Sequence, residues 1–416
     1  MRRSTLAGAA LAGAGAALLL GLALWSAKRH KDPHLELETD APVEELLPSI
    51  AGMSLGMPIA GNAVDIVQDA AFFDALVADI DAARSSVHFE TFLWKEGELG
   101  ARLVDAFCAA AARGCEVRLV LDALGCRKMG DEARRRLAEA GCGLALYHPA
   151  GLRHIGMLFE RDHRKIAVLD GRVAWVGGHC VCDDWLKLRD LSVRLRGPVV
   201  HAVQSVFSEN WVETTGRLFA GDGVFPQPEP AGGVLAHVAS VKPEGSAPAV
   251  KILHHAMICC ARKRFWIQNP YFIPEPDAVH ALAAAVRRGV DVRVMTPAAR
   301  VSDMPVVQRA GQRNFRELLD AGVRIFEYHR SLLHQKVMSV DGVWAAVGSS
   351  NFDDRSFETN DELTLGFLDA GLARRLEQIF EADMRHCEEL DARAWRRRGI
   401  ARRARDSALY LFNEVL

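Results

Sequence analysis

Segments in which apolar residues recur at helical spacing alternate along the chain with segments typical of strands. Residues 70–83 repeat apolar residues at the spacing of an α-helix, and residues 86–94 (SVHFETFLW) have the composition of a strand. A further helix over 99–113 ends at a glycine, and a strand follows over 116–122. Because helices and strands alternate, the pattern predicts an α/β fold in which helices pack on a sheet.

The same order of elements returns in the second half of the chain. We expect a helix at 251–261, a strand at 264–268, a helix at 277–288 and a strand at 291–295. Short sequences return with them, since RGCEVR at 113–118 corresponds to RGVDVR at 288–293. One structural unit therefore occurs twice, and a stretch rich in Gly and Pro at 219–233 separates the copies.

These boundaries divide the chain into a first lobe, 61–233, and a second lobe, 234–416, which ends in an arginine-rich helix. That helix suits contact with anionic lipid as well as it suits a solvated surface. Residues 32–60 are acidic at first and then rich in Pro, Gly and Met, and we interpret them as a linker. Regular structure is therefore expected to begin near Gly61.

An uncharged run from Thr5 to Ala27, rich in Ala, Leu and Gly, has basic residues on both sides. Its length exceeds the roughly 20 residues that a helix needs to cross a bilayer. A cleaved signal peptide is the alternative, but its apolar region is only ~7–15 residues long. We therefore expect residues 1–31 to be a single-pass anchor in the cell membrane. The flanking charges are balanced and leave its orientation open.

The overall charge and the cysteines narrow the choice of function. The formal net charge is only −2, so the chain lacks the basic field of a general nucleic-acid binder, and no nucleic-acid partner is expected. The nine cysteines show no CxxC or zinc-ligand spacing. We interpret them as reduced core residues, which favours a reducing compartment and hence cytoplasmic lobes.

Each lobe contains one His-x-Lys-x4-Asp motif. The motif residues are His163, Lys165 and Asp170 in the first lobe and His334, Lys336 and Asp341 in the second. A turn of small residues follows both motifs at the same distance, as Gly177-Gly178 and as Gly348-Ser349. Two copies at matched spacing argue against a chance similarity.

The spacing within the motif has a geometric consequence. Residues two apart on a strand share a face, so each motif places an imidazole beside an ammonium group. The small residues of the next turn let the backbone approach an anion closely. Two facing motifs then suit a phosphodiester, because lysines can hold its oxygens while one imidazole attacks phosphorus and the other protonates the leaving oxygen. A zinc site is not expected, because neither histidine has a second ligand at a usable spacing.

These motifs resemble those of the phospholipase D superfamily and, within it, those of the bacterial cardiolipin synthases. The resemblance covers about residues 60–416 and includes several shorter segments. They are RDHRK at 161–165, NPYFIP at 269–274, LLDAGV at 318–323, GSSN at 348–351, DRS at 354–356 and NDE at 360–362.

The resemblance implies two duplicated α/β lobes related by pseudo-twofold symmetry, with a single active site between them. It also implies a covalent phosphohistidine and no cofactor or metal. One of His163 and His334 would be the nucleophile, and the other would be the general acid and base. Lys165 and Lys336 would bind the phosphate.

Other roles are implied by the resemblance as well. Asp170 and Asp341 would orient or support the catalytic motifs. The turns that follow would contribute Gly178, Ser349 and Asn351 to substrate binding.

The first lobe departs from the family pattern. The family usually has Asn where this chain has Cys180, so a weak thiol donor stands where an amide is expected. His179 is either a local hydrogen-bonding residue or a substitute for that donor. Glu90 and Asp122 end predicted strands and are interpreted as structural or orienting carboxylates. Three aromatic residues are assigned to the core or to a rim that faces acyl chains: Trp185, Phe207 and Trp211.

The resemblance therefore implies a membrane-bound phosphatidyltransferase, most like a cardiolipin synthase. Its phospholipid substrate would be phosphatidylglycerol, with phosphatidylethanolamine as a second candidate. The alternatives are a phospholipase D hydrolase, a nuclease with the same site, and a non-enzymatic scaffold. The complete His and Lys pairs argue against a scaffold, and the anchor favours lipid over nucleic acid. Whether water or an alcohol is the acceptor depends on the shape of the cleft and stays open.

Overall fold

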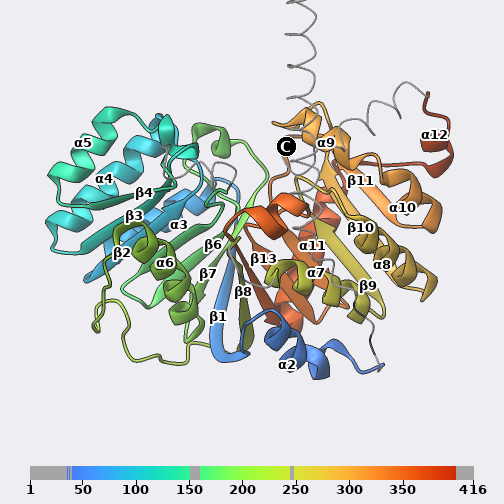
Figure 1. Cartoon of the computed structure of the whole chain (residues 1–416), viewed down its shortest axis with the longest axis horizontal. Coiled ribbons are helices and arrows are strands. Elements are labelled where there is room, and N and C mark those ends of the chain that lie inside the picture. The colour runs from blue at the N-terminus through green and yellow to red at the C-terminus, as the bar shows by residue number, and fades with distance from the viewer. Residues whose placement is uncertain (1–34, 36, 38–39, 150–159, 244–247, 400–416) are drawn as a thin grey trace, which may run out of the picture. The chain divides into compact units, whose positions relative to one another are not determined.

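One mixed sheet of fifteen strands forms the centre of the computed structural model, which describes residues 35, 37, 40–149, 160–243 and 248–399 (Figure 1). Seven strands come from the first half of the chain: β1 (Ile59–Gln68), β2 (Ser86–Thr91), β3 (Glu116–Asp122), β4 (Gly143–Tyr147), β5 (Lys165–Leu169), β6 (Val173–Gly177) and β7 (Leu191–Arg196). The others come from the second half: β8 (Val234–Val241), β9 (Arg264–Gln268), β10 (Asp291–Pro297), β11 (Arg324–Tyr328), β12 (Val337–Val340), β13 (Trp344–Gly348), β14 (Glu362–Leu368) and β15 (Cys387–Glu389).

Helices cover this sheet through apolar side chains. The helices of the first half are α2 (Val43–Met53), α3 (Ala71–Ala82), α4 (Glu98–Ala112), α5 (Asp131–Glu139) and α6 (Val199–Thr215). Those of the second half are α7 (Ala249–Cys260), α8 (Pro276–Arg287), α9 (Pro305–Gly311), α10 (Phe315–Ala321), α11 (Ala370–Met384) and α12 (Ala392–Arg396). Leu76 of α3 and Phe107 of α4, for example, are fully buried against Val87 of β2. The predicted α/β class is confirmed.

The strand order repeats on the two sides of the sheet. From β1 outward the order is β7, β6, β5, β2, β3 and β4, and from β8 outward it is β14, β13, β12, β9, β10, β11 and β15. Corresponding strands therefore occupy corresponding places, as expected of a duplicated unit. Because β1 pairs with β8, the sheet is continuous, and the division into lobes at 61–233 and 234–416 stays a prediction.

The segment 32–60 is more than the linker that we expected. It contains α2, whose Val43, Leu47 and Ile50 are buried in the same apolar cluster as α7, and β1 already begins at Ile59. The expectation that regular structure begins near Gly61 is therefore wrong. Apolar residues at helical spacing stabilise this helix despite the Pro and Gly content of the segment.

The predicted anchor, residues 1–31, lies outside the described residues. The arginine-rich segment, 393–405, is described only as far as residue 399 and begins in the short helix α12. Across the described part of the chain, every helix is too short or too polar to span a bilayer.

The register of the strands brings both motifs to one edge of the sheet. Lys165, the first residue of β5, pairs with Thr91, the last residue of β2. Val337, the first residue of β12, likewise pairs with Gln268, the last residue of β9. We call this the site edge: it holds the carboxyl ends of β2, β3, β9 and β10 and the amino ends of β5 and β12. His163 and His334 both lie on it, just before β5 and β12.

Candidate active site

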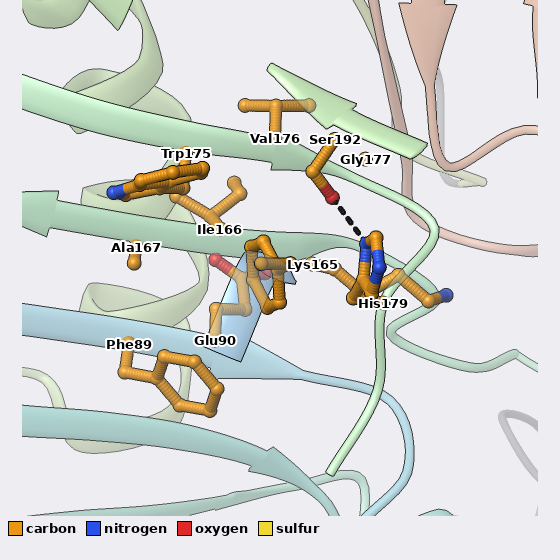
Figure 2. A pocket seen from close by; sticks show the side chains of 11 residues that line it. Phe89, Glu90, Lys165, Ile166, Ala167, Trp175, Val176, Gly177, His179 and Ser192 are labelled. Carbon is orange, nitrogen blue, oxygen red and sulfur yellow. Dashed lines mark hydrogen bonds between the residues drawn. The ribbon is translucent and has the colours of Figure 1, made fainter. Parts of the chain in front are cut away.

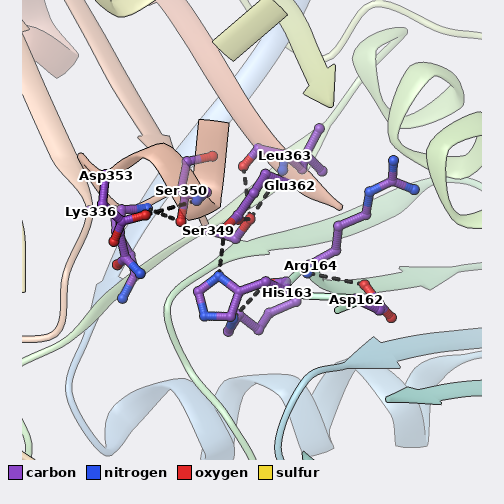
Figure 3. A network of polar contacts seen from close by, with 12 residues as sticks. Asp162, His163, Arg164, Lys336, Ser349, Ser350, Asp353, Glu362 and Leu363 are labelled. Carbon is purple, nitrogen blue, oxygen red and sulfur yellow. Dashed lines mark hydrogen bonds and ion pairs between the residues drawn. The ribbon is translucent and has the colours of Figure 1, made fainter. Parts of the chain in front are cut away.

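The imidazole of His163 is bound by a buried carboxylate. Its Nδ1 lies 2.7 Å from Oε1 of Glu362, the first residue of β14 (Figure 3). The backbone N–H of His163 donates to the carbonyl oxygen of Asp361 at 3.0 Å, which holds the two segments together. When Glu362 is ionised it only accepts hydrogen bonds, so Nδ1 then carries the proton and Nε2 is available for chemistry.

His334 has the same arrangement. Its Nδ1 lies 2.8 Å from Oδ2 of Asp190, and its backbone N–H donates to the carbonyl oxygen of Arg189 at 2.7 Å. Asp190 also accepts hydrogen bonds from Nε1 of Trp185 at 2.9 Å and from the backbone N–H of Leu191 at 2.8 Å. These donors fix the carboxylate, which in turn fixes the orientation of the imidazole.

Each imidazole is thus held by a carboxylate from the other half of the chain. Asp190 follows His163 by 27 positions, and Glu362 follows His334 by 28, so the two carboxylates occupy corresponding places in the duplicated unit. Among the described residues, neither motif histidine is bound by a carboxylate of its own half. The candidate site is therefore assembled from both halves.

The surroundings of the two imidazoles differ electrostatically. Burial lowers the pKa of His163 well below its ordinary value, and the charges of Lys165 and Lys336 lower it further. Burial and Lys336 also lower the pKa of His334, but there Asp190 acts in the opposite direction. His163 is the imidazole that is held neutral more firmly, and His334 is the one that retains a proton better.

The two carboxylates differ as well. Burial raises the pKa of Glu362 to about 7, although the charge of Lys165 and a hydrogen bond from Ser349 oppose it. For Asp190 burial acts in the same direction, but the combined effects of His334, His179 and Lys336 outweigh it, and the pKa falls below its ordinary value. Asp190 is therefore the more firmly ionised of the two.

The lysines of the motifs lie beside the histidines. Nζ of Lys336 lies 3.0 Å from Nε2 of His334 and donates to the carbonyl oxygen of that residue at 2.7 Å. Lys165 donates to the carbonyl oxygen of His163. Burial lowers the pKa of Lys336 to about 8, and the charge of Lys165 contributes to this. Two ammonium groups on side chains that are only 6% and 5% exposed would be stabilised by an anion such as a phosphate.

The turns after the motifs position the carboxylates. The hydroxyl of Ser349 donates to Glu362 and accepts from the backbone N–H of Leu363 at 3.0 Å (Figure 3). A Cβ on Gly178 would overlap the carboxylate of Asp190, so glycine is needed there. Oδ1 of Asn351 is buried and makes no hydrogen bond with the described residues. Of the three residues expected to bind substrate, Asn351 has the side chain most available to do so.

His179 does not replace the donor that Cys180 lacks. Its Nδ1 lies 2.7 Å from the hydroxyl of Ser192 and its Nε2 lies 2.9 Å from the carbonyl oxygen of Asp69. Figure 2 shows its ring at the end of a pocket that also includes Lys165. Because both ring nitrogens of His179 already have partners, it is a local structural residue.

Asp170 and Asp341 lie away from the histidines, in places that suit the supporting role expected of them, which stays a prediction. They follow the opposite ends of β5 and β12, in the left-handed conformation with φ of 52° and 55°. Asp170 accepts hydrogen bonds from three consecutive backbone N–H groups, at residues 84–86, at 2.9, 2.7 and 2.9 Å. Asp341 binds the N–H groups at 262–264 in the same way. Each aspartate fastens the loop before a central strand.

Replacing Asp170 with alanine is expected to lower the free energy of unfolding by about 2–3 kcal/mol, because three backbone donors lose a charged acceptor. Turnover per folded molecule should stay within about threefold of the wild type, since no reacting atom is near. Denaturant unfolding and steady-state kinetics test this. Asp170→Asn, which tolerates the left-handed conformation and keeps one acceptor oxygen, is the matched control. A large loss of turnover in well-folded Asp170→Ala would assign it a catalytic role after all.

The remaining residues of interest have structural partners. Nδ2 of Asn210 donates to Glu90 at 2.9 Å, and Asp122 accepts from the backbone of the loop that follows β3. Phe207 and Trp211 belong to the core. Trp185 was assigned to the core or rim, but its indole N–H binds the carboxylate partner of His334.

The sequence analysis did not predict that three residues contact the motif histidines or their partners: Asp190, Glu362 and Trp185. The available signal was the matched spacing of the two carboxylates after the two histidines.

We expect mutations in the turns that follow the two motifs to have unequal effects on turnover. Asn351→Ala is expected to reduce turnover about 10²-fold or more, since losing one donor to a developing negative charge costs about that much. Cys180→Ala should change turnover by less than about threefold, because burial raises the pKa of this thiol and makes it a poor donor. Cys180→Asn should match or exceed the wild type. The measurement is turnover of the three variants on one lipid substrate. Equal losses for the two alanine variants would contradict the unequal roles of Asn351 and Cys180.

The comparisons with known proteins agree with this geometry. A family model described as "Cardiolipin synthase, PLD-like domain" matches residues 76–211 and 255–384, and each segment contains one motif. The probable cardiolipin synthase YwiE of Bacillus subtilis (strain 168) is 33% identical over 343 residues, which are 80% of this chain and 68% of that protein. The major cardiolipin synthase ClsA of the same organism is 32% identical over 366 residues, or 85% and 76%.

A solved structure supports the fold. The phosphatidylserine synthase of Haemophilus influenzae Rd KW20 superimposes with a TM-score of 0.70, covering 88% of this chain and 98% of that one. At 13% sequence identity this likeness concerns the fold alone.

Proposed function

The chain belongs to the cardiolipin synthase family of phospholipase D-like proteins, and on that premise we propose that it is a phosphatidyltransferase that works through a covalent phosphohistidine. The observation that carries the proposal is the exchange of carboxylates between the two halves, which orients two imidazoles beside two lysines. The relatives named as cardiolipin synthases support phosphatidylglycerol as the substrate.

His163 is the nucleophile in this proposal. Its neutral imidazole, held with Nδ1–H toward Glu362, attacks the phosphorus of phosphatidylglycerol through Nε2. A P–N bond forms while the P–O bond to the glycerol headgroup breaks. His334, whose proton Asp190 stabilises, gives that proton to the departing glycerol oxygen. Lys165 and Lys336 hold the non-bridging oxygens during the displacement.

The second displacement reverses these roles. His334, now neutral, takes the proton from the terminal hydroxyl of a second phosphatidylglycerol, and the oxygen attacks phosphorus. The P–N bond breaks and His163 is restored. The balanced products are a lipid that contains two phosphatidyl groups on one glycerol, and free glycerol.

Two alternatives share the same first step. Water in place of the alcohol would give a phospholipase D hydrolase, and a nucleic-acid phosphodiester in place of lipid would give a nuclease. The identity of 32–33% over most of the chain supports transfer between lipids over both. We also propose that residues 1–31 hold the enzyme at the cell membrane, where both substrates lie.

The test is incubation of the purified full chain with phosphatidylglycerol, alone and together with phosphatidylethanolamine, with products identified by mass spectrometry. With phosphatidylglycerol alone, the lipid that carries two phosphatidyl groups on one glycerol and free glycerol are expected in equal amounts. Phosphatidic acid as the main product would indicate hydrolysis instead. Because lysines supply the positive charge, turnover is expected to persist in EDTA, and its loss there would contradict this mechanism.

A further inference from the structure

Four of the exposed large apolar side chains lie in the connections at the site edge, one of them (Val306) in the first turn of α9. They are Leu124 (51% exposed), Leu186 (41%), Met304 (42%) and Val306 (39%). Leu124 follows the carboxyl end of β3, and Met304 and Val306 follow that of β10. Leu186 lies in a 3₁₀ turn, Asp183–Leu186, on the connection from β6 to β7.

Strand register places all three loops on the same side as the histidines. Leu121 of β3 pairs with Thr91, which pairs with Lys165. Met295 of β10 pairs with Gln268 of β9. Gln268 in turn pairs with Val337 of β12, the residue after Lys336. The β6–β7 connection begins after Gly177 and ends before Leu191. It lies at the same edge as the start of β5, because β6 pairs antiparallel with β5. The apolar tips therefore lie at the site edge in both halves.

Basic side chains accompany these tips. They are Arg127, Lys128, Lys187 and Arg300, all exposed. None of the four makes an ion pair or a side-chain hydrogen bond with residues that the structure describes. Three carboxylates of the same connections have partners within the protein. Asp183 accepts hydrogen bonds from the backbone N–H groups of Glu98 and Leu99. Asp184 forms an ion pair with Lys95, and Asp303 accepts a hydrogen bond from Tyr271.

Single exposed apolar residues are common on soluble proteins and need no explanation. The combination at the site edge is different, because exposed apolar side chains and unpaired cations from both halves gather at the edge that holds both histidines. That composition matches the boundary of an anionic bilayer, where phosphates lie above a hydrocarbon layer. A substrate phosphate that stays in the bilayer can reach His163 and His334 only if this edge faces the membrane.

We propose that the loops carrying Leu124, Leu186, Met304 and Val306 dock on the interface of a bilayer rich in anionic phospholipid, with the four basic residues contacting its phosphates. This inference rests on the proposed function, because it takes the substrate to be a lipid in a membrane. The apolar tips enter the boundary between headgroups and acyl chains, and the site edge is thereby held against its substrate.

The test uses the full chain with the double change Leu124→Asp and Met304→Asp. In mixed micelles, the surface fraction of phosphatidylglycerol needed for half-maximal rate is expected to rise about tenfold or more, since two apolar contacts are replaced by charges. On a short-chain phosphatidylglycerol that is monomeric in water, the rate should change by less than about twofold. The matched control, Leu55→Asp with Met57→Asp, alters exposed residues that precede β1, whose amino end lies at the opposite edge of the sheet. It should behave as the wild type.

Equal effects of the site-edge and control variants on micellar lipid would overturn the docking proposal, as would a change in oligomeric state that accounts for the loss. A second measurement needs no turnover: hydrogen–deuterium exchange of residues 123–130, 183–188 and 299–306 in nanodiscs. Protection in phosphatidylglycerol that is weaker in phosphatidylcholine supports docking, and equal exchange in both overturns it. If protection is found but the wild type turns over no lipid, the proposed function fails and the docking surface stands.

Discussion

Replacing His163 with alanine is expected to lower turnover of phosphatidylglycerol by about 10⁴-fold or more, and His334→Ala should do the same. The first change removes the atom that bonds to phosphorus, and the second removes the proton donor and acceptor. Because the two groups act in one sequence of steps, the double variant should be only slightly worse than either single variant. Steady-state rates with mass-spectrometric detection of the product provide the measurement.

The control for these variants is His280→Ala, which changes a histidine on α8 whose side chain is 71% exposed. It should keep the activity of the wild type. A single His163 or His334 variant that retained more than half of the activity would show that the two halves do not share one site. A double variant that lost the product of the two single effects would show that they act independently.

Asp190→Asn is expected to reduce turnover by about 10³–10⁴-fold without unfolding the protein. The amide has the shape of the carboxylate but can present a donor to Nδ1 of His334, which favours the tautomer with the proton on the wrong nitrogen. The equivalent exchange in a serine protease costs about 10⁴ in rate. Glu362→Gln should act in the same way on His163.

Thermal unfolding must accompany this measurement, because Asp190 also binds Trp185 and the backbone. Trp185→Phe is the informative companion variant, since it removes one donor to Asp190 and leaves the carboxylate in place. We expect it to be impaired less than Asp190→Asn. If Asp190→Asn kept more than a tenth of the activity, the carboxylate would not be selecting the tautomer of His334.

The sequence was sufficient for those parts of the molecule that depend on local pattern. The alternation of helices and strands identified α3, β2, α4 and β3 close to their observed bounds. The spacing of His and Lys was expected to place each pair on one face of a strand, but both histidines lie just before β5 and β12. In the second motif Nζ of Lys336 nevertheless lies 3.0 Å from the imidazole of His334.

Other features could not be predicted, because they depend on which segments far apart in the sequence contact each other in the fold. Nothing local to Asp190 or Glu362 shows that each faces a histidine about half a chain away, and the matched spacing acquires meaning only after the strands are paired. The place where Asp170 acts was also beyond a local reading. An orienting or supporting role was expected, but the length of β5 separates Asp170 from the reacting groups by roughly 16 Å at about 3.3 Å per residue. α2 was missed because Pro48 and the surrounding Pro and Gly outweighed a helical apolar period.

The exchange of carboxylates between the halves also governs when activity can arise during the life of the protein. A first half that folds during synthesis holds His163 without Glu362, and it holds Asp190 without the imidazole that Asp190 orients. On the proposed mechanism, a partly synthesised chain would therefore lack a complete site. A substitution of the carboxylate in one half would likewise act on the histidine of the other half.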